Sequence, residues 1–222
     1  MRKILLFTYI MTLCNFSALA QEKFQGFYGG ITLSHSDAKD HGKEFEFDGS
    51  QDVNQKNEPN GESVSLNFGY NEILTNSFLI GFDGSLEKNN VDDKVQQTYL
   101  GVDEECCTVK SKIKESIYLG LKLGKVITED TLMYLSAGKA LKHIQRGFND
   151  TSISEYHSDT VWQNGWYFGI GIEKYINNNL TILIDYKNID LGERTYYGFP
   201  NWGIEKHDYR ENNYRVGINY YF

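Results

Sequence analysis

The chain has 222 residues, of which 14% are aromatic, 23% are charged and two are proline, and its net charge at pH 7 is −8. This acidic balance argues against nucleic-acid binding, for which a basic surface is the usual footprint. No apolar run reaches the roughly 18 residues of a membrane-spanning helix, whereas many aromatic residues and few prolines suit β-strands.

The first twenty residues have the pattern of a secretion signal. A basic start at residues 2–3 precedes an apolar run, Ile4–Leu13, that is too short to span a membrane, and a small-x-small cleavage site follows at Ala18–Ala20. We therefore predict that residues 1–20 are a cleaved signal peptide and that residues 21–222 form one domain. Residues 1–20 hold two basic and no acidic side chains, so their removal changes the net charge from −8 to −10. A lipid anchor on Cys14 is the alternative, which the bulky Leu13 before it disfavours.

Eight segments then alternate between apolar residues and small or polar ones. A period of two is typical of a β-strand with one apolar and one wet face. In the last segment, Tyr214, Val216, Ile218 and Tyr220 alternate with smaller or polar residues. The predicted strands are Phe24–His35, Glu62–Tyr70, Ser77–Lys88, Lys112–Gly124, Thr131–His143, Trp162–Tyr175, Leu180–Leu191 and Tyr214–Phe222.

The connections between these strands alternate in length. Short turns are predicted at Asn71–Asn76, Lys125–Asp130 and Asn177–Asn179, and long polar loops at Ser36–Gly61, Asn89–Ser111, Gln145–Thr160 and Gly192–Arg210. An even number of strands with short turns at one end and long loops at the other is typical of an outer-membrane barrel. We predict an all-β fold, an eight-stranded antiparallel transmembrane up-and-down β-barrel. A soluble sandwich or lipocalin-like barrel also alternates, but the Gly-, Ser- and charge-rich face would pack its core poorly.

The fifth strand departs from the pattern at Lys139. This lysine lies in phase with the apolar residues Met133, Leu135 and Ala137. A β-bulge near Lys139, or emergence of the strand into the lipid headgroups, would account for it, and the sequence does not choose between them.

Four parts of the chain resemble a known family. They are Gly26–Gly30 (GFYGG), Gly165–Tyr175 (GWYFGIGIEKY), Asp185–Gly192 (with DYK and DLG) and Tyr214–Phe222 (YRVGINYYF). Together they resemble the small bacterial outer-membrane proteins called "porin family" or "outer membrane protein beta-barrel domain". The resemblance implies a place in the bacterial outer membrane, with its lipid and the barrel assembly machinery as partners. It leaves the activity open, since such proteins include adhesins and complement or haem binders.

The ending of the chain also resembles this family. Tyr220 and the final Phe222 are similar to the C-terminal assembly signal of outer-membrane barrels. We expect these two residues to serve as that signal.

Charges of both signs fall on the inward face of the predicted strands. The interior of an eight-stranded barrel is just wide enough for side chains to fill, so buried charges must pair or be hydrated. We expect a network of ion pairs that fills the lumen, and a narrow conductance path through the same residues is the alternative. These residues are Asp83, Glu87, Lys122, Glu173, Asp185, Lys187 and Arg215.

Outward aromatic residues near the strand ends are typical of the membrane interface. We expect Tyr70, Trp166, Tyr186 and Tyr220 to form such a girdle. Trp202, in the last predicted loop, is a candidate for stacking on a ligand.

Two His-Ser pairs, His35-Ser36 and His157-Ser158, each followed by an aspartate, resemble the His/Ser pairs of lipid A-modifying barrels. Neighbouring residues of a strand point to opposite faces, so spacing alone does not make either pair a dyad. We do not predict an enzyme. The histidines of the predicted loops also lack the spacing of metal ligands, so we predict no metal and no cofactor. They are His35, His41, His157 and His207.

Cys106 and Cys107 are adjacent and have no other cysteine partner after residue 20. They could form a vicinal disulfide, link two molecules or stay reduced. Zinc needs more ligands than this pair offers.

These observations predict a barrel with a largely filled lumen and a structural or surface-interaction role. Its four long external loops would contact a host or cell-surface ligand. A small passive porin is the alternative. Large inward residues such as Tyr118 and Tyr221 favour the first reading, because they leave little lumen.

Overall fold

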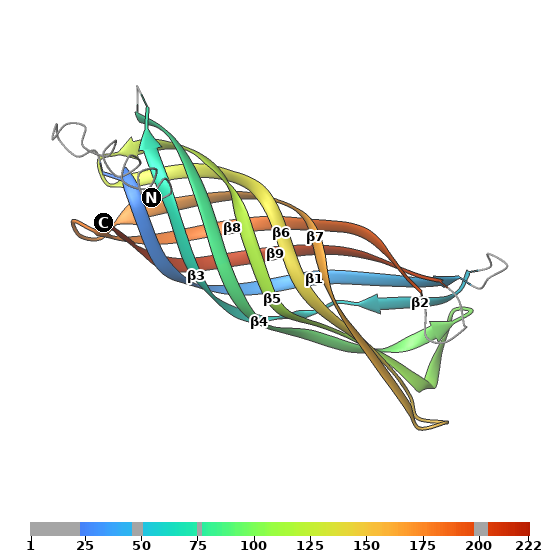
Figure 1. The fold of residues 1–222 in the computed structure, drawn as a ribbon. Helices are drawn as coiled ribbons and strands as arrows, with labels where there is room; N and C mark the ends of the chain where they lie inside the picture. The colour runs from blue at the N-terminus through green and yellow to red at the C-terminus, as the bar shows by residue number, and fades with distance from the viewer. Residues whose placement is uncertain (1–22, 46–50, 75–76, 198–203) are drawn as a thin grey trace, which may run out of the picture.

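The computed structural model describes residues 23–45, 51–74, 77–197 and 204–222 (Figure 1). The predicted signal peptide, residues 1–20, and the candidate ligand residue Trp202 lie outside these ranges. Among the described residues, no helix is long and apolar enough to cross a membrane.

The described chain is built almost entirely of antiparallel strands. Each strand from β3 onward pairs with the next one along the chain, and β1 pairs with both β3 and β9. The β1–β9 ladder runs from Tyr28 opposite Tyr221 to Phe45 opposite Ile204 and closes the sheet into a ring. The strands are β1 Gly26–Phe45, β2 Gln51–Asn57, β3 Asn60–Ile73, β4 Phe78–Tyr99, β5 Val102–Thr128, β6 Thr131–Asp150, β7 Glu155–Tyr175, β8 Leu180–Tyr197 and β9 Ile204–Tyr221.

Strands β2 and β3 share one position in the ring. The pairing of β1 with β3 ends at Asp37 opposite Asn60, and its pairing with β2 begins at Asp40 opposite Asn57. Pro59 lies between them and has no N–H to donate to a ladder, although its carbonyl accepts a hydrogen bond from the Ala38 N–H at 2.8 Å. Among the described residues the ring therefore has eight strands, and the predicted fold class is confirmed.

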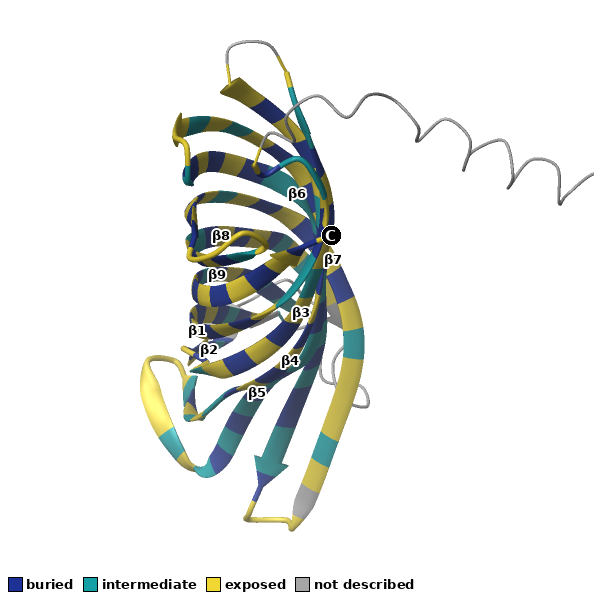
Figure 2. Cartoon of the chain, turned by 90° about the vertical axis from the view of Figure 1, so that its left-hand side faces the viewer, coloured by how far each residue is buried: buried dark blue, intermediate teal, exposed yellow. Residues whose placement is uncertain are grey.

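Buried and exposed residues alternate along the strands (Figure 2). On β1 the outward side chains Phe27, Ile31 and Leu33 are 57–63% exposed, whereas the inward Thr32 and Ser34 are buried. A large apolar surface on the outside and small or polar residues inside is the reverse of a soluble barrel. It fits a closed ring in lipid, where every backbone group of a spanning segment is paired between strands.

The prediction of four long loops was wrong. The segments assigned to loops are mostly strand: β1 continues to Phe45, β4 and β5 meet at a two-residue turn, Leu100–Gly101, and β7 begins at Glu155. The apolar alternation stops where the outward face leaves the lipid, but backbone hydrogen bonding continues beyond that level. The strands therefore project as extensions at the end opposite the short turns, the start of β1 and the end of β9 (Figure 1).

Lys139 lies in a regular part of β6. It pairs with Leu119 on one side and Trp166 on the other without a shift of register, so the proposed bulge at this position was wrong. Its side chain points outward, with Nζ 3.5 Å from the centroid of the Trp166 ring. The nearby bulge falls instead on β5 at Lys114, where both ladders shift.

Candidate functional site: lumen and outer face

An aromatic cluster occupies the lumen at the end where the chain termini lie. The rings of Phe24 and Tyr175 are 4.7 Å apart between centroids, and those of Tyr28 and Tyr221 are 5.3 Å apart. The members of this cluster are Phe24, Tyr28, Leu79, Leu132, Tyr134, Tyr175 and Tyr221.

The inner glycines make room for these large rings. A Cβ at Gly69 would collide with Tyr28, one at Gly171 with Tyr134, and one at Gly120 with the Tyr167 hydroxyl. The Gly-rich face thus packs well once tyrosines from other strands lie across it.

A charged layer follows the aromatic cluster along the lumen. Lys122 Nζ donates a hydrogen bond to the Tyr28 hydroxyl at 2.9 Å and lies 3.9 Å from Glu173. Glu173 also accepts hydrogen bonds from Thr181 at 2.6 Å and Asn219 at 2.9 Å. All of these side chains are buried.

Two further ion pairs lie near the middle of the barrel. Arg215 Nε is 3.6 Å from Asp185, and Arg215 donates a hydrogen bond to Asn67 at 2.9 Å. Lys187 Nζ is 3.9 Å from Asp83. A cavity among these side chains measures about 20 Å³, roughly the space of one water molecule.

The structure thus places all seven predicted charges on the inner face. Six of them form three pairs, Lys122–Glu173, Lys187–Asp83 and Arg215–Asp185. Glu87 is buried as well and accepts a hydrogen bond from Ser34 at 3.2 Å. Their role as a stabilising network stays a prediction.

Sequence reasoning missed two pairs of charged side chains in the upper lumen. Lys142 and Glu211 are 2.8 Å apart with side chains at most 1% exposed, and Ser36 donates a hydrogen bond to Glu211 at 2.9 Å. Further out, Arg146 makes two hydrogen bonds of 2.9 Å to Asp40.

Asp40 contacts side-chain donors from three other strands. Besides Arg146 of β6, it accepts a hydrogen bond from Ser111 of β5 at 2.6 Å and contacts His207 Nδ1 of β9 at 3.2 Å. Most of these residues fall in stretches that the sequence assigned to loops. The continued alternation of Ser34, Ser36, Ala38 and Asp40 is the signal that could have found the first of them.

The Asp40 group lies beyond the lipid-facing band, which ends at Leu33 on β1 and Tyr214 on β9. Burial favours the neutral form of Asp40, but the Arg146 charge and the His207 hydrogen bond outweigh it and hold the pKa of Asp40 well below its usual range. Burial works to lower the pKa of His207, yet the hydrogen bonds to Asp40 and Glu205 raise it above the ordinary histidine value. Both pKa shifts thus favour the charged forms of Asp40 and His207.

The four predicted girdle residues all lie on the outer face. Tyr70 and Tyr220 lie near the short turns, and Trp166 and Tyr186 lie toward the extensions. Tyr186 donates a hydrogen bond to Asn212 at 2.6 Å. Phe222 is 74% exposed and its ring is 5.3 Å from that of Tyr220. The girdle and assembly roles of these residues stay predictions.

The first His-Ser pair does not converge. His35 points outward, with Nδ1 2.8 Å from Glu62, whereas Ser36 points inward to Glu211. His207 belongs to the Asp40 group. These placements follow from the opposite faces of a strand.

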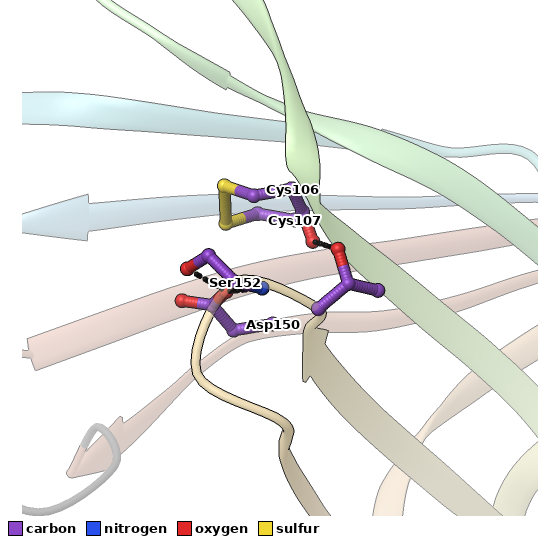
Figure 3. The surroundings of a disulfide bond; sticks show 5 residues. Cys106, Cys107, Asp150 and Ser152 are labelled. Atoms are coloured by element: carbon purple, nitrogen blue, oxygen red, sulfur yellow. Dashed lines mark hydrogen bonds between the residues drawn. A yellow bond between two sulfur atoms is a disulfide. The ribbon is translucent and has the colours of Figure 1, made fainter.

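Cys106 and Cys107 are joined to each other by a disulfide near the outer end of β5 (Figure 3). The Thr151 N–H and hydroxyl donate hydrogen bonds of 2.9 and 3.0 Å to the Cys106 carbonyl, which attaches this segment to the turn after β6. Glu104 lies within metal-binding reach of both sulfur atoms, but the sulfur atoms are bonded to each other.

Comparisons with known proteins agree with this architecture. The family model described as "Outer membrane protein beta-barrel domain" matches residues 6–222. The "31 kDa outer-membrane immunogenic protein" of Brucella melitensis biotype 1 is 29% identical over 157 residues, which cover 69% of this chain and 63% of that protein. The match thus spans less than two thirds of the relative's length.

Two solved structures share the fold. OprG from Pseudomonas aeruginosa has a TM-score of 0.59 at 15% identity, covering 89% of this chain and 96% of OprG. The outer membrane protease OmpT from Escherichia coli has a TM-score of 0.60 at 9% identity, covering 92% of this chain and 99% of OmpT. At these identities the likeness concerns the fold alone.

Proposed function

The chain belongs to the outer membrane protein beta-barrel domain family and lies in the bacterial outer membrane, and from this premise we propose that its barrel is a closed anchor presenting the strand extensions to a partner outside the cell. A host or cell-surface ligand would bind to these extensions. We propose no catalytic role.

The filled lumen is the observation that carries this proposal. An aromatic cluster, three ion pairs and the buried Lys142–Glu211 pair follow one another along the interior. The cavity of about 20 Å³ between them is far smaller than a continuous water path requires. These features favour an anchor over a passive porin.

The extensions supply a surface suited to a partner. Beyond the lipid-facing band they expose polar residues, such as Lys39 and Lys43 of β1, beside apolar ones, such as Tyr156 and Trp162 of β7. The related Brucella protein is described as immunogenic, which agrees with an exposed outer surface for this chain.

Shortening an extension tests the surface role. Joining Gly147 to Ser158 through Asn-Gly removes the end of the β6–β7 extension and keeps the register, because these two residues face each other in the ladder. We expect cells carrying this variant to lose about tenfold or more in adherence to host cells if the extension holds a binding hot spot. A matched control replaces Asn177–Asn179 at the opposite end. The surface role is wrong if separate shortening of every extension leaves adherence unchanged in folded protein.

Conductance in a planar bilayer separates the anchor from the porin. We expect silence from purified protein whose heat-modifiable mobility shows that it is folded. Steady channels that change in an Arg215→Ala variant would mean that the lumen conducts, and the porin reading would replace ours.

A further inference from the structure

A basic patch lies on the outer side of β4, β5 and β6, just beyond the lipid-facing band. It consists of Lys88, Lys110, Lys112, Lys114 and His143. Four of them, Lys88, Lys112, Lys114 and His143, line one groove, although the chain as a whole carries a net charge of −8. Such a concentration at the headgroup level calls for an explanation.

The bulge on β5 creates the densest part of the basic patch. Ile113 and Ser116 point inward and are at most 1% exposed, so both residues between them, Lys114 and Glu115, turn to the outer face. A bulge re-aims side chains in this way. Lys112 and Lys114 consequently line one groove of about 910 Å³ on the outside of the barrel.

Intramolecular pairing leaves part of this charge uncompensated. Glu115 lies 2.7 Å from Lys88 and 2.5 Å from His143, and Asp92 lies 3.1 Å from Lys110. Within the described part of the chain, Lys112 and Lys114 form no ion pair. On the far side of the barrel, by contrast, Arg210 lies between Asp190 at 3.7 Å and Asp208 at 3.5 Å.

The groove also has an apolar edge. Leu33 and Val64, at the outer limit of the lipid-facing band, line it together with the lysines. Leu33 and Glu62 belong as well to a second groove of about 670 Å³, whose other walls are mostly apolar side chains facing lipid. Most of that second groove lies on β7, β8 and β9, and it meets the basic groove at Leu33 and Glu62.

We propose that the basic patch binds the phosphate groups of a phosphorylated glycolipid of the outer leaflet, with its acyl chains against the apolar edge formed by Leu33 and Val64. Lys112 and Lys114 supply the free ammonium groups, and the membrane holds the ligand at their level. Because the membrane keeps the lipid phosphate within reach of these lysines, a membrane-anchored phosphate is favoured over a soluble one.

Lipid binding to folded protein in detergent tests the proposal. The probes are bisphosphorylated lipid A and the same glycolipid with both phosphates removed. A basic side chain near an anionic membrane surface contributes about fivefold in affinity, so the double variant Lys112→Gln, Lys114→Gln should bind the phosphorylated probe about 30-fold more weakly. Its affinity for the dephosphorylated probe should stay within about twofold of the wild type, because no phosphate contact is lost.

A matched control removes the same charge elsewhere. Lys39 and Lys43 are exposed on β1 outside the basic patch, so the variant Lys39→Gln, Lys43→Gln should bind lipid A like the wild type. Should the double patch variant fail to fold, Lys112→Arg, Lys114→Arg keeps the charge and should keep the affinity.

Three results would overturn the proposal. Equal losses of lipid A affinity in the patch and control variants would mean that net charge alone, and not the basic patch, determines binding. Equal binding of both glycolipids would remove the phosphate from recognition. Displacement of lipid A by inorganic phosphate or by a soluble sulfated polysaccharide at similar concentration would make the basic patch a site for soluble anions.

Discussion

At the scale of single residues, Arg215 shows how the lumen depends on pairing. Its side chain is buried between Asp185 and Asn67, so its removal leaves a buried carboxylate without its cation. We expect Arg215→Leu to destabilise the barrel by about 3–5 kcal/mol, the usual cost of breaking a buried pair. Lys39→Leu, on the exposed face of β1, should cost less than about 0.5 kcal/mol. Equal shifts of the heat-modifiable transition in the two variants would count against a lumen network.

His207 gives the upper barrel a dependence on pH. Its folded pKa is raised, so its contribution to stability is complete below about pH 6.5, the unfolded value, and is lost as the pH rises through the folded pKa. The contribution of Asp40, whose pKa is lowered, is present above about pH 4 and is lost as the pH falls through its folded value.

We therefore expect the unfolding temperature of the wild type to fall between pH 6 and pH 9. His207→Gln should remove most of this fall, because the titrating partner of Asp40 is gone. His41→Gln, on the same extension, serves as the control and should follow the wild type. A fall of equal size in the His207 variant would assign the pH dependence to other groups.

At the scale of elements, the sequence predicted which residues face out far better than where strands end. The register of Leu66 opposite Ile31 and of Leu121 opposite Phe82 follows the predicted outward faces, because lipid demands apolar side chains at each. Above the lipid, apolar and polar residues occur on both faces, as with inward Ile113 and Ile144 and outward Trp162, so alternation no longer distinguishes strand from loop. The inward position of Asp40, Arg146 and His207 was missed for that reason. Their pairing could not be predicted either, because residues so distant in sequence can be matched only when the strand register is known.

The disulfide between Cys106 and Cys107 is an element-scale feature with a small expected effect. It joins neighbouring residues and closes no long loop, so it barely restricts the unfolded chain. We expect Cys106→Ser, Cys107→Ser to shift the free energy of unfolding by less than about 1 kcal/mol, because the bond closes no loop and serine is close to cysteine in size. Non-reducing electrophoresis of the wild type should show monomer. A disulfide-linked dimer would contradict the intramolecular bond.

At the scale of the whole molecule, contacts across the filled interior connect all parts of the ring. Large tyrosines lie over Gly69, Gly120 and Gly171, and charges pair between strands that are distant in sequence. Stability is therefore distributed around the ring, and a local change in an extension should leave the spanning part intact. Limited proteolysis of intact cells tests this expectation: cleavage confined to the extensions should leave a heat-modifiable core, and loss of that core would contradict it.

The ladder between β1 and β9 joins the first strand to the last, with Tyr28 opposite Tyr221. Contacts of such high sequence separation form slowly, because the entropy cost of closing a long loop comes before the contacts repay it. Until they form, β1 and β9 are two open edges able to capture strands of other chains. In pulse-labelled refolding, the amides of Ile31 and Ile218 should gain protection after those of Leu121 and Leu135. Before the ring closes, the nascent protein is therefore open to pairing with other chains, and we expect its two edge strands to need protection on the way to the membrane.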